Sequence, residues 1–217
     1  MIYSRKHNYI FIHIPKTGGT SMALALENRA AKDDVMLGDT PKAIKRRTRV
    51  KDVAAAGRLW KHSTLFDIDG LVTPEEVAGA RVFTMVRNPW DRLVSYYHWL
   101  QRQEFYHEAV RIAKSSTFSE FLNHDHTKAS FRANPYGRYV TGVDGSERCD
   151  LFVRLEHLDE DLPKLEALID LKLHPFPHEN SSARGDAFQG YYSAADRRLV
   201  SQLAEADIER FGYQFDG

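Results

Sequence analysis

The pattern of apolar and polar positions predicts strands that alternate with helices along the chain. Residues 9–14 form a nearly continuous apolar run, rich in β-branched and aromatic side chains, which is typical of a strand buried on both faces. Similar runs lie at 81–86 and 151–153, and helical signals follow each of them. We therefore predict an α/β protein of three layers, in which helices flank a central parallel sheet.

Capping residues indicate where the helices begin. A capping box at 73–76, with proline at the first helical position, predicts a short helix that ends near Gly79. Asn88 followed by proline predicts a longer helix, whose apolar residues are spaced for one buried face at Trp90, Leu93, Val94 and Tyr97. Further helices are predicted over 159–169 and from Ser193 to Gly212.

Length and charge limit the possible functions. The 217 residues suit one ordinary domain, and because no repeat or Gly/Ser linker marks a boundary, a single domain over 1–217 is predicted. Lys and Arg together number 30, as do Asp and Glu. The molecule as a whole therefore has no field that would attract nucleic acid or an anionic membrane. Any anion has to be bound by a local site.

Several features are those expected of a cytoplasmic protein. No apolar run approaches the roughly 20 residues that a membrane-spanning helix needs. Residues 1–7 are short and polar and lead directly into the first apolar run, so the tripartite pattern of a secretion signal is missing. Cys149 is the single cysteine, which excludes an intramolecular disulfide framework and a zinc site made of several cysteines.

A candidate phosphate-binding loop follows the first predicted strand. Residues 16–21 read Lys-Thr-Gly-Gly-Thr-Ser and precede a set of good helix formers, with Thr20 or Ser21 placed to cap the helix. Glycines let the backbone approach a phosphate, successive N–H groups converge on it, and the helix dipole favours its charge. The loop is P-loop-like, but its lysine precedes the glycines, whereas the nucleoside-triphosphate loop G-x-x-x-x-G-K-S/T places lysine after them. A turn with a surface lysine is the alternative.

A second candidate anion site lies one strand and one helix further along. Arg87 follows the predicted strand at 81–86, and Ser95 lies two turns into the next helix. If the two strand–helix units are neighbours in the sheet, both residues meet a second phosphate at the crevice where such sheets bind ligands. For either residue taken alone, a well-capped helix with solvated charges at Asp91 and Arg92 is the alternative interpretation.

These segments resemble two motifs of the sulfotransferases that use 3′-phosphoadenosine 5′-phosphosulfate (PAPS). Residues 9–21 resemble their 5′-phosphosulfate loop, and residues 86–97 resemble their 3′-phosphate motif. More narrowly, the chain resembles the branch that includes the carbohydrate sulfotransferases, such as the heparan sulfate uronosyl 2-O-sulfotransferases and many bacterial relatives. Further similarities cover almost the whole chain and lie at 61–64, 154–158, 180–184 and 207–213.

The resemblance implies transfer of a sulfuryl group from PAPS to an acceptor, most often a hydroxyl group, with release of adenosine 3′,5′-bisphosphate. Lys16 is expected to contact the 5′-phosphate and the oxygen that bridges to sulfur. The remaining phosphate oxygens are expected to be held by the backbone and hydroxyls of Thr17, Gly18, Gly19, Thr20 and Ser21. Arg87 and Ser95 are expected to bind the 3′-phosphate, the arginine through a charge-assisted fork and the serine through one hydrogen bond.

Two further roles rest on the resemblance. His62 is the candidate general base, because it lies between the two motifs in a segment where family members carry a similarly placed histidine, and histidine suits proton transfer near neutral pH. Lys61 beside it either touches the sulfuryl group or is solvated. Arg184 is expected to add a contact to the 3′-phosphate from the loop that closes over the nucleotide. This chain departs there from many relatives, because Asn-Ser-Ser stands where they place lysine or another polar residue before the serine.

The other histidines receive structural interpretations. His13 alternates with the isoleucines of the first strand and is expected to pack under a helix. His124 and His126 lack a third ligand at metal spacing, so no metal is expected there. The resemblance needs no metal either, because lysine and arginine supply the neutralising charge.

A local excess of positive charge lies between the phosphate loop and His62. Its six basic residues are Lys42, Lys45, Arg46, Arg47, Arg49 and Lys51. The window either forms a solvated helix face or mobile loop, or lines an acceptor groove for an acidic glycan. The acceptor itself is expected to be a saccharide or another hydroxyl-bearing molecule.

Two other functions compete with sulfuryl transfer. A P-loop kinase or NTPase needs a lysine after the glycines and a magnesium-binding carboxylate at a strand end, and neither is convincing in this sequence. A non-catalytic module that binds PAPS or the bisphosphate would keep the nucleotide cleft, but the intact Lys16 and His62 count against it. The leading hypothesis is therefore a sulfotransferase that acts on a saccharide or glycoconjugate.

Overall fold

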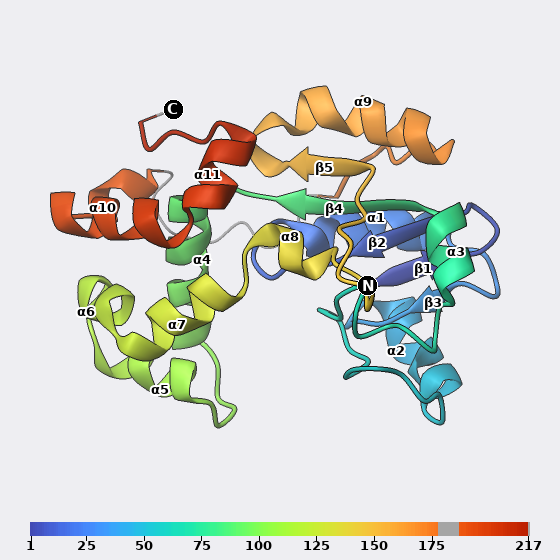
Figure 1. The fold of residues 1–217 in the computed structure, drawn as a ribbon, viewed down its shortest axis with the longest axis horizontal. Coiled ribbons are helices and arrows are strands. Elements are labelled where there is room, and N and C mark those ends of the chain that lie inside the picture. Colours follow the sequence, from blue (N-terminus) through green and yellow to red (C-terminus); the bar gives the residue numbers. More distant parts are fainter. Residues whose placement is uncertain (178–186, 217) are drawn as a thin grey trace. The chain divides into compact units, whose positions relative to one another are not determined.

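The computed structural model describes residues 1–177 and 187–216, and the chain groups into two compact units (Figure 1). The sheet unit comprises Met1–Val86 and Tyr136–Ser181, and the helical unit comprises Arg87–Pro135 and Ser182–Gly217. Each unit is thus built from two separate stretches of chain. The single domain over 1–217 stays a prediction.

A five-stranded mixed sheet forms the centre of the sheet unit. In spatial order its strands are β3 (Val35–Met36), β1 (Ile2–Ser4), β2 (Tyr9–Ile12), β4 (Arg81–Val86) and β5 (Leu151–Arg154). Strands β2, β4 and β5 are parallel, which confirms the predicted centre of the sheet. Strand β1 is antiparallel to both β2 and β3, and the sequence prediction missed this edge. It treated residues 1–7 as a polar lead-in, but the short turn between β1 and β2 permits only antiparallel pairing.

Helices and irregular chain cover the two faces of this sheet. The helices of the sheet unit are α1 (Gly19–Arg29), α2 (Pro41–Arg46), α3 (Pro74–Gly79), α8 (Tyr136–Tyr139) and α9 (Leu158–Ile169), with 3₁₀ turns η1 (Arg47–Val50) and η2 (Leu155–His157). The capping box predicted for α3 is present, since the Thr73 hydroxyl and the Glu76 carboxylate each accept the other residue's N–H. Helix α9 confirms the helix predicted over 159–169.

Alternating side chains of β2 divide the core into two clusters. Tyr9 and Phe11 pack in one cluster with α1 and α9, whereas Ile10 and Ile12 pack in the other with segment 65–80. All four side chains are fully buried, as their continuous apolar pattern predicted. Burial of each one contributes roughly 1.5–3 kcal/mol, so β2 is a firm base for the loop that follows it.

The helical unit begins directly after β4. Its helices are α4 (Pro89–Gln101), α5 (Glu108–Ser115), α6 (Phe118–Asn123), α7 (Asp125–Ala133), α10 (Ala194–Leu203) and α11 (Glu205–Phe211), with a 3₁₀ turn η3 (Phe188–Tyr191). Helix α4 starts as predicted, because the Asn88 side chain accepts the N–H of Trp90 at 3.1 Å. Its four predicted apolar positions are all buried.

The last predicted helix is two helices. A capping box between Ser193 and Asp196 opens α10, and a left-handed Gly212 ends α11, as the sequence predicted. The chain leaves the helical conformation at Ala204, where φ is −120°. Alanine has the highest helix propensity of all residues, so the sequence carries no signal for this break.

Candidate active site

The predicted phosphate loop joins β2 to α1 within the sheet unit. Lys16 has a φ of 67° and Gly18 a φ of 85°, so two residues of the loop adopt left-handed backbone. Gly18 is the N-cap of α1, and no side chain caps the helix. The expectation that Thr20 or Ser21 caps it is wrong, because the chain turns into the helix earlier, through the left-handed glycine. The N–H of Ser21 then donates to the carbonyl oxygen of Gly18 at 3.1 Å.

Both glycines of the loop are required by close packing. A Cβ at Gly18 would lie 2.8 Å from Leu155 Cδ1, and its positive φ disfavours any other residue. A Cβ at Gly19 would lie 2.2 Å from Cδ2 of His13. The buried Thr17 ties the loop to the end of the strand, since its hydroxyl donates to the carbonyl oxygen of Ile14 at 2.9 Å. The hydroxyl proton of Thr17 is therefore used within the loop, so the main-chain N–H is the donor that this residue has for an anion.

This arrangement suits an anion. The first N–H groups of an α-helix have no acceptor within the helix, and the helix dipole adds partial positive charge at the same end. Helix α1 is eleven residues long and starts with the two glycines, where no Cβ shields the backbone. The half-buried Lys16, which precedes α1, adds a full positive charge. This charge also helps to lower the pKa of His13.

His62 is held by a main-chain carbonyl next to this loop. Its Nδ1 lies 2.7 Å from the carbonyl oxygen of His13. Because a carbonyl only accepts, Nδ1 carries the hydrogen of the neutral ring, and the lone pair is then on Nε2. Burial, the largest cause, and the charge of Lys61 lower the pKa of His62 to about 4, although the hydrogen bond to His13 raises it. At neutral pH the ring is therefore uncharged and able to accept a proton at Nε2.

A compact turn fixes the segment around His62. The Ser63 hydroxyl is completely buried, lies 2.9 Å from the carbonyl oxygens of both Arg58 and Trp60, which share its one hydrogen as acceptors, and accepts the N–H of Trp60 at 2.8 Å. The Trp60 ring packs edge-on against His62, with centroids 5.0 Å apart. Lys61 is neither simply solvated nor unpaired, because its ammonium group forms an ion pair with Asp39 at 2.7 Å.

A cavity of about 140 Å³ adjoins both segments. Its polar wall includes His13, Thr20, Asp39 and Lys61, and its apolar wall includes Leu24, Met36, Leu37 and Ala43. The cavity therefore borders the phosphate loop on one side and the segment with His62 on the other. A small molecule bound near His62 would have this space beside it.

The basic window spans α2, η1 and Lys51, and five of its six basic side chains fall into two groups. Three of them donate to main-chain carbonyl oxygens, namely Lys42 to Glu27 at 2.6 Å, Arg46 to Asp34 at 3.2 Å and Arg49 to Lys32 at 2.7 Å. These three fasten α2 and η1 to the neighbouring chain. The sequence hypotheses of a solvated face, a loop or a groove did not include this role.

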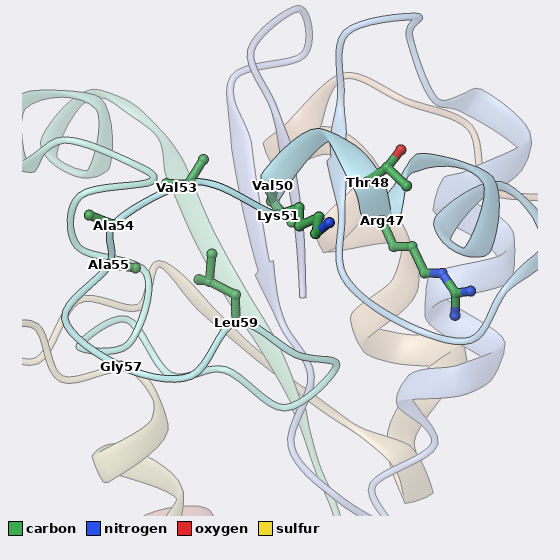
Figure 2. Close-up of a pocket in the computed structure, with 9 residues that line it drawn as sticks. All are labelled: Arg47, Thr48, Val50, Lys51, Val53, Ala54, Ala55, Gly57 and Leu59. Atoms are coloured by element: carbon green, nitrogen blue, oxygen red, sulfur yellow. The ribbon is translucent and has the colours of Figure 1, made fainter.

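The second group, Arg47 and Lys51, lines an open groove of about 650 Å³. Figure 2 shows Arg47 and Lys51 on one side of it and the small side chains of Val53, Ala54 and Ala55 on the other. Neither basic side chain forms an ion pair or hydrogen bond with a residue that the structure describes. The groove thus has two cationic side chains that no described residue engages in an ion pair or hydrogen bond.

The second motif lies in the helical unit. Arg87 forms an i,i+4 ion pair with Asp91, in which Nε lies 2.7 Å from Oδ2, and both side chains are mostly buried. Ser95 is buried further along α4. The alternative interpretation of this segment had Asp91 as solvated charge, whereas in the structure its carboxylate pairs with the Arg87 guanidinium. The i,i+4 spacing of opposite charges on a helix was the signal for this pair.

Other predictions concern residues or groups outside these two motifs. Arg184 and the segment 180–184 lie outside the described residues. Within 1–177 and 187–216, no cluster of three His, Cys, Asp or Glu side chains is placed to hold a metal ion. In the same ranges, no helix combines the length and the apolar character needed to cross a membrane. That Lys16, Arg87 and Ser95 bind one nucleotide stays a prediction.

Comparison with known proteins gives a family match over nearly the whole chain. The model of the sulfotransferase family matches residues 1–214. Among solved structures, mouse sulfotransferase SULT7A1 complexed with PAP is similar, with a TM-score of 0.49 and 13% sequence identity. That similarity covers 95% of this chain and 85% of the mouse chain. No curated protein matches the sequence.

Proposed function

This chain belongs to the sulfotransferase family, and we propose that it transfers a sulfuryl group from PAPS to a hydroxyl group of a saccharide or glycoconjugate. The family membership supports the reaction class. The state of His62 supports the mechanism, because a neutral imidazole with its hydrogen fixed on Nδ1 presents the Nε2 lone pair that a general base needs. This is the observation that carries the proposal.

The acceptor loses its proton to His62 as it attacks sulfur. The acceptor hydroxyl gives its hydrogen to Nε2, its oxygen forms a bond to sulfur, and the bond from sulfur to the bridging oxygen of PAPS breaks. The electron pair of that bond stays on the 5′-phosphate of the departing adenosine 3′,5′-bisphosphate. The imidazolium formed keeps its Nδ1–H on the His13 carbonyl oxygen, and the phosphate and sulfate charges of the substrate raise the pKa of His62 toward the working range.

The charge that develops on the phosphate is met by the loop. Sulfuryl transfer resembles phosphoryl transfer, in which the protein mainly positions the reactants and stabilises the leaving oxygen. Lys16 is proposed for the bridging oxygen, and the N–H groups of residues 17–21 for the other oxygens of the 5′-phosphate. Arg87 and Ser95 are proposed for the 3′-phosphate. The pairing with Asp91 holds the plane of the Arg87 guanidinium, which favours a directional contact with phosphate.

The groove lined by Arg47 and Lys51 is proposed to bind the acceptor. Arg47 and Lys51 carry charges that no described side chain balances, which supports an acceptor with carboxylate or sulfate groups. The groove leads by chain from Leu59, which lines it, into the turn that contains His62. A saccharide with acidic substituents combines both requirements, a hydroxyl at the base and negative charge in the groove.

Transfer of labelled sulfate from PAPS to a panel of glycans tests the proposal. Lys16→Ala and His62→Ala should each lower transfer by about 10²-fold or more, whereas the exposed controls Lys6→Ala and His157→Ala should keep it. Full activity in either site variant would remove the corresponding role. Calorimetry should show binding of adenosine 3′,5′-bisphosphate without magnesium. Tighter binding of ATP with magnesium would instead favour a kinase or NTPase.

A further inference from the structure

The His13 side chain lies between the phosphate loop and the base. The residue is 5% exposed and directly follows β2. On one side, a Cβ at Gly19 would lie 2.2 Å from Cδ2 and 2.5 Å from Nε2 of this ring. On the other side, the ring meets the His62 imidazole edge to face, with centroids 4.7 Å apart and an interplanar angle of 74°. One flat side chain therefore touches both parts of the candidate active site.

The main chain of the same residue makes the second connection. The carbonyl oxygen of His13 accepts the Nδ1–H of His62 at 2.7 Å. The carbonyl of the residue before it, Ile12, accepts the hydroxyl of the buried Thr84 at 2.7 Å, so the strand end that presents these groups is itself fixed. Movement of residue 13 would thus change the loop and the base together.

The ring of His13 suits this place because it is uncharged. Burial is the largest cause that lowers its pKa well below the ordinary value, and His62, the Met1 amino group, Lys61 and Lys16 act in the same direction. A charged ring would repel the Lys16 ammonium group that the phosphate needs. The ring forms no hydrogen bond to a described residue and borders the 140 Å³ cavity, so its contribution to the loop and the base is contact and shape.

We propose that His13 is a positioning residue, which seats the glycine turn of the phosphate loop with its ring and orients His62 with its carbonyl and its ring. The proposal rests on the proposed role of His62 as the base. It predicts that loss of the ring leaves the carbonyl in place but lets the His62 ring tilt and take up water. The group that accepts the proton is then misplaced relative to a sulfuryl donor held by the loop.

The first experiment separates the ring from its nitrogens. His13→Ala should lower kcat by about 10²-fold, because a base misplaced by about an ångström costs that much, and should raise KM for PAPS by a smaller factor, because the glycine turn loses the ring that seats it. His13→Phe keeps a flat ring and should retain most of kcat. An alanine variant with the kcat of the wild type, or a phenylalanine variant as impaired as the alanine variant although both unfold at the wild-type temperature, would overturn the proposal.

The second experiment uses the close approach at Gly19. Gly19→Ala should weaken binding of adenosine 3′,5′-bisphosphate by about tenfold or more, because the new methyl group overlaps the His13 ring. The double variant with His13→Ala should recover part of this binding but none of kcat. Gly79→Ala is the matched control, since a Cβ there meets no atom within 4 Å. Equal weakening by Gly19→Ala in both backgrounds would contradict the contact.

A third measurement does not depend on sulfuryl transfer at all. The titratable groups that face His62 are His13, Lys61, the Met1 amino group and Asp39. NMR titration should show that the pKa of His62 rises toward 6.5 in His13→Ala, because the ring becomes hydrated, and stays low in His13→Phe. An unchanged pKa in His13→Ala would overturn the proposal. If the wild type transfers no sulfate, the proposed function fails, while binding and titration still decide the role of His13.

Discussion

The protonation of His62 gives a quantitative test of the arrangement around it. Burial and the charge of Lys61 lower its pKa from 6.5 to about 4. In the unfolded chain the ring titrates near its ordinary value, so between pH 6.5 and pH 4 the unfolded state binds more protons than the folded state. Stability is therefore complete above pH 6.5 and is lost as the pH falls through this window. With a pKa of 6.5 in the unfolded state and about 4 in the folded state, the free energy of unfolding at pH 5 is about 2 kcal/mol lower than at neutral pH.

Urea unfolding at pH 7 and pH 5 measures this loss, with His62→Asn as the control. Asparagine places an amide nitrogen where Nδ1 stands and so keeps a donor for the His13 carbonyl, but it does not titrate. Burial also lowers the pKa of His13, and that contribution is present in both proteins. From pH 7 to pH 5, the free energy of unfolding of the wild type should therefore fall by about 2 kcal/mol more than that of His62→Asn. The same pH dependence in both proteins would refute the assigned state of His62.

The pH dependence of activity follows from the same state. The acid limb of kcat/KM reports the pKa of the free enzyme, so it should lie near 4, below the ordinary histidine value. The acid limb of kcat reports the complex and should lie higher, because the negative charges of PAPS favour the imidazolium. A kcat/KM limb near pH 6.5 would contradict the burial of this base.

Two further predictions concern the framework of the sheet unit. Asp161→Asn should lower the free energy of unfolding, measured by urea titration, by about 2–4 kcal/mol. The buried Asp161 carboxylate accepts four N–H groups, and Arg154 holds its pKa well below the usual range. The control Glu160→Gln, at an exposed neighbour, should lower the free energy of unfolding by less than ~1 kcal/mol. Ser63→Ala should lower the free energy of unfolding by about 1–3 kcal/mol, because a buried hydroxyl that both donates and accepts hydrogen bonds is lost. Ser201→Ala, on an exposed helix surface, should be nearly neutral, and equal effects of the two serine variants would contradict the assigned role of the turn.

Local signals in the sequence predicted the elements that depend on local physics. The apolar run at 9–14 predicted the central strand, Asn88 and the capping boxes predicted helix starts, and the order of strands and helices predicted the parallel centre of the sheet. Where the signal was weak, the prediction failed. Strand β1 was missed because three residues are too few for a periodic pattern, and the break at Ala204 was missed because alanine favours the helix that is interrupted there.

In the candidate site, too, the sequence predicted the residues of local motifs but not their partners from distant parts of the chain. Lys16 and the glycines were found because a phosphate imposes a recurring local geometry on a few consecutive residues. The partners of those residues were not found, because they come from distant parts of the sequence. His13 meets His62 across 49 positions, and Lys61 meets Asp39 across 22. The periodicity of apolar and polar residues along the sequence does not predict contacts between residues so far apart.

The burial of His13 was predicted from the sequence, but its contacts were not. Its alternation with isoleucines correctly indicated burial, and burial was then read as simple packing under a helix. The contacts give this side chain a further role, because Gly19 leaves room for a flat ring and the base packs on its other side. A histidine next to a glycine-bearing phosphate loop is therefore better treated as part of the site than as part of the core, and the His13→Phe variant measures how much of that role is shape.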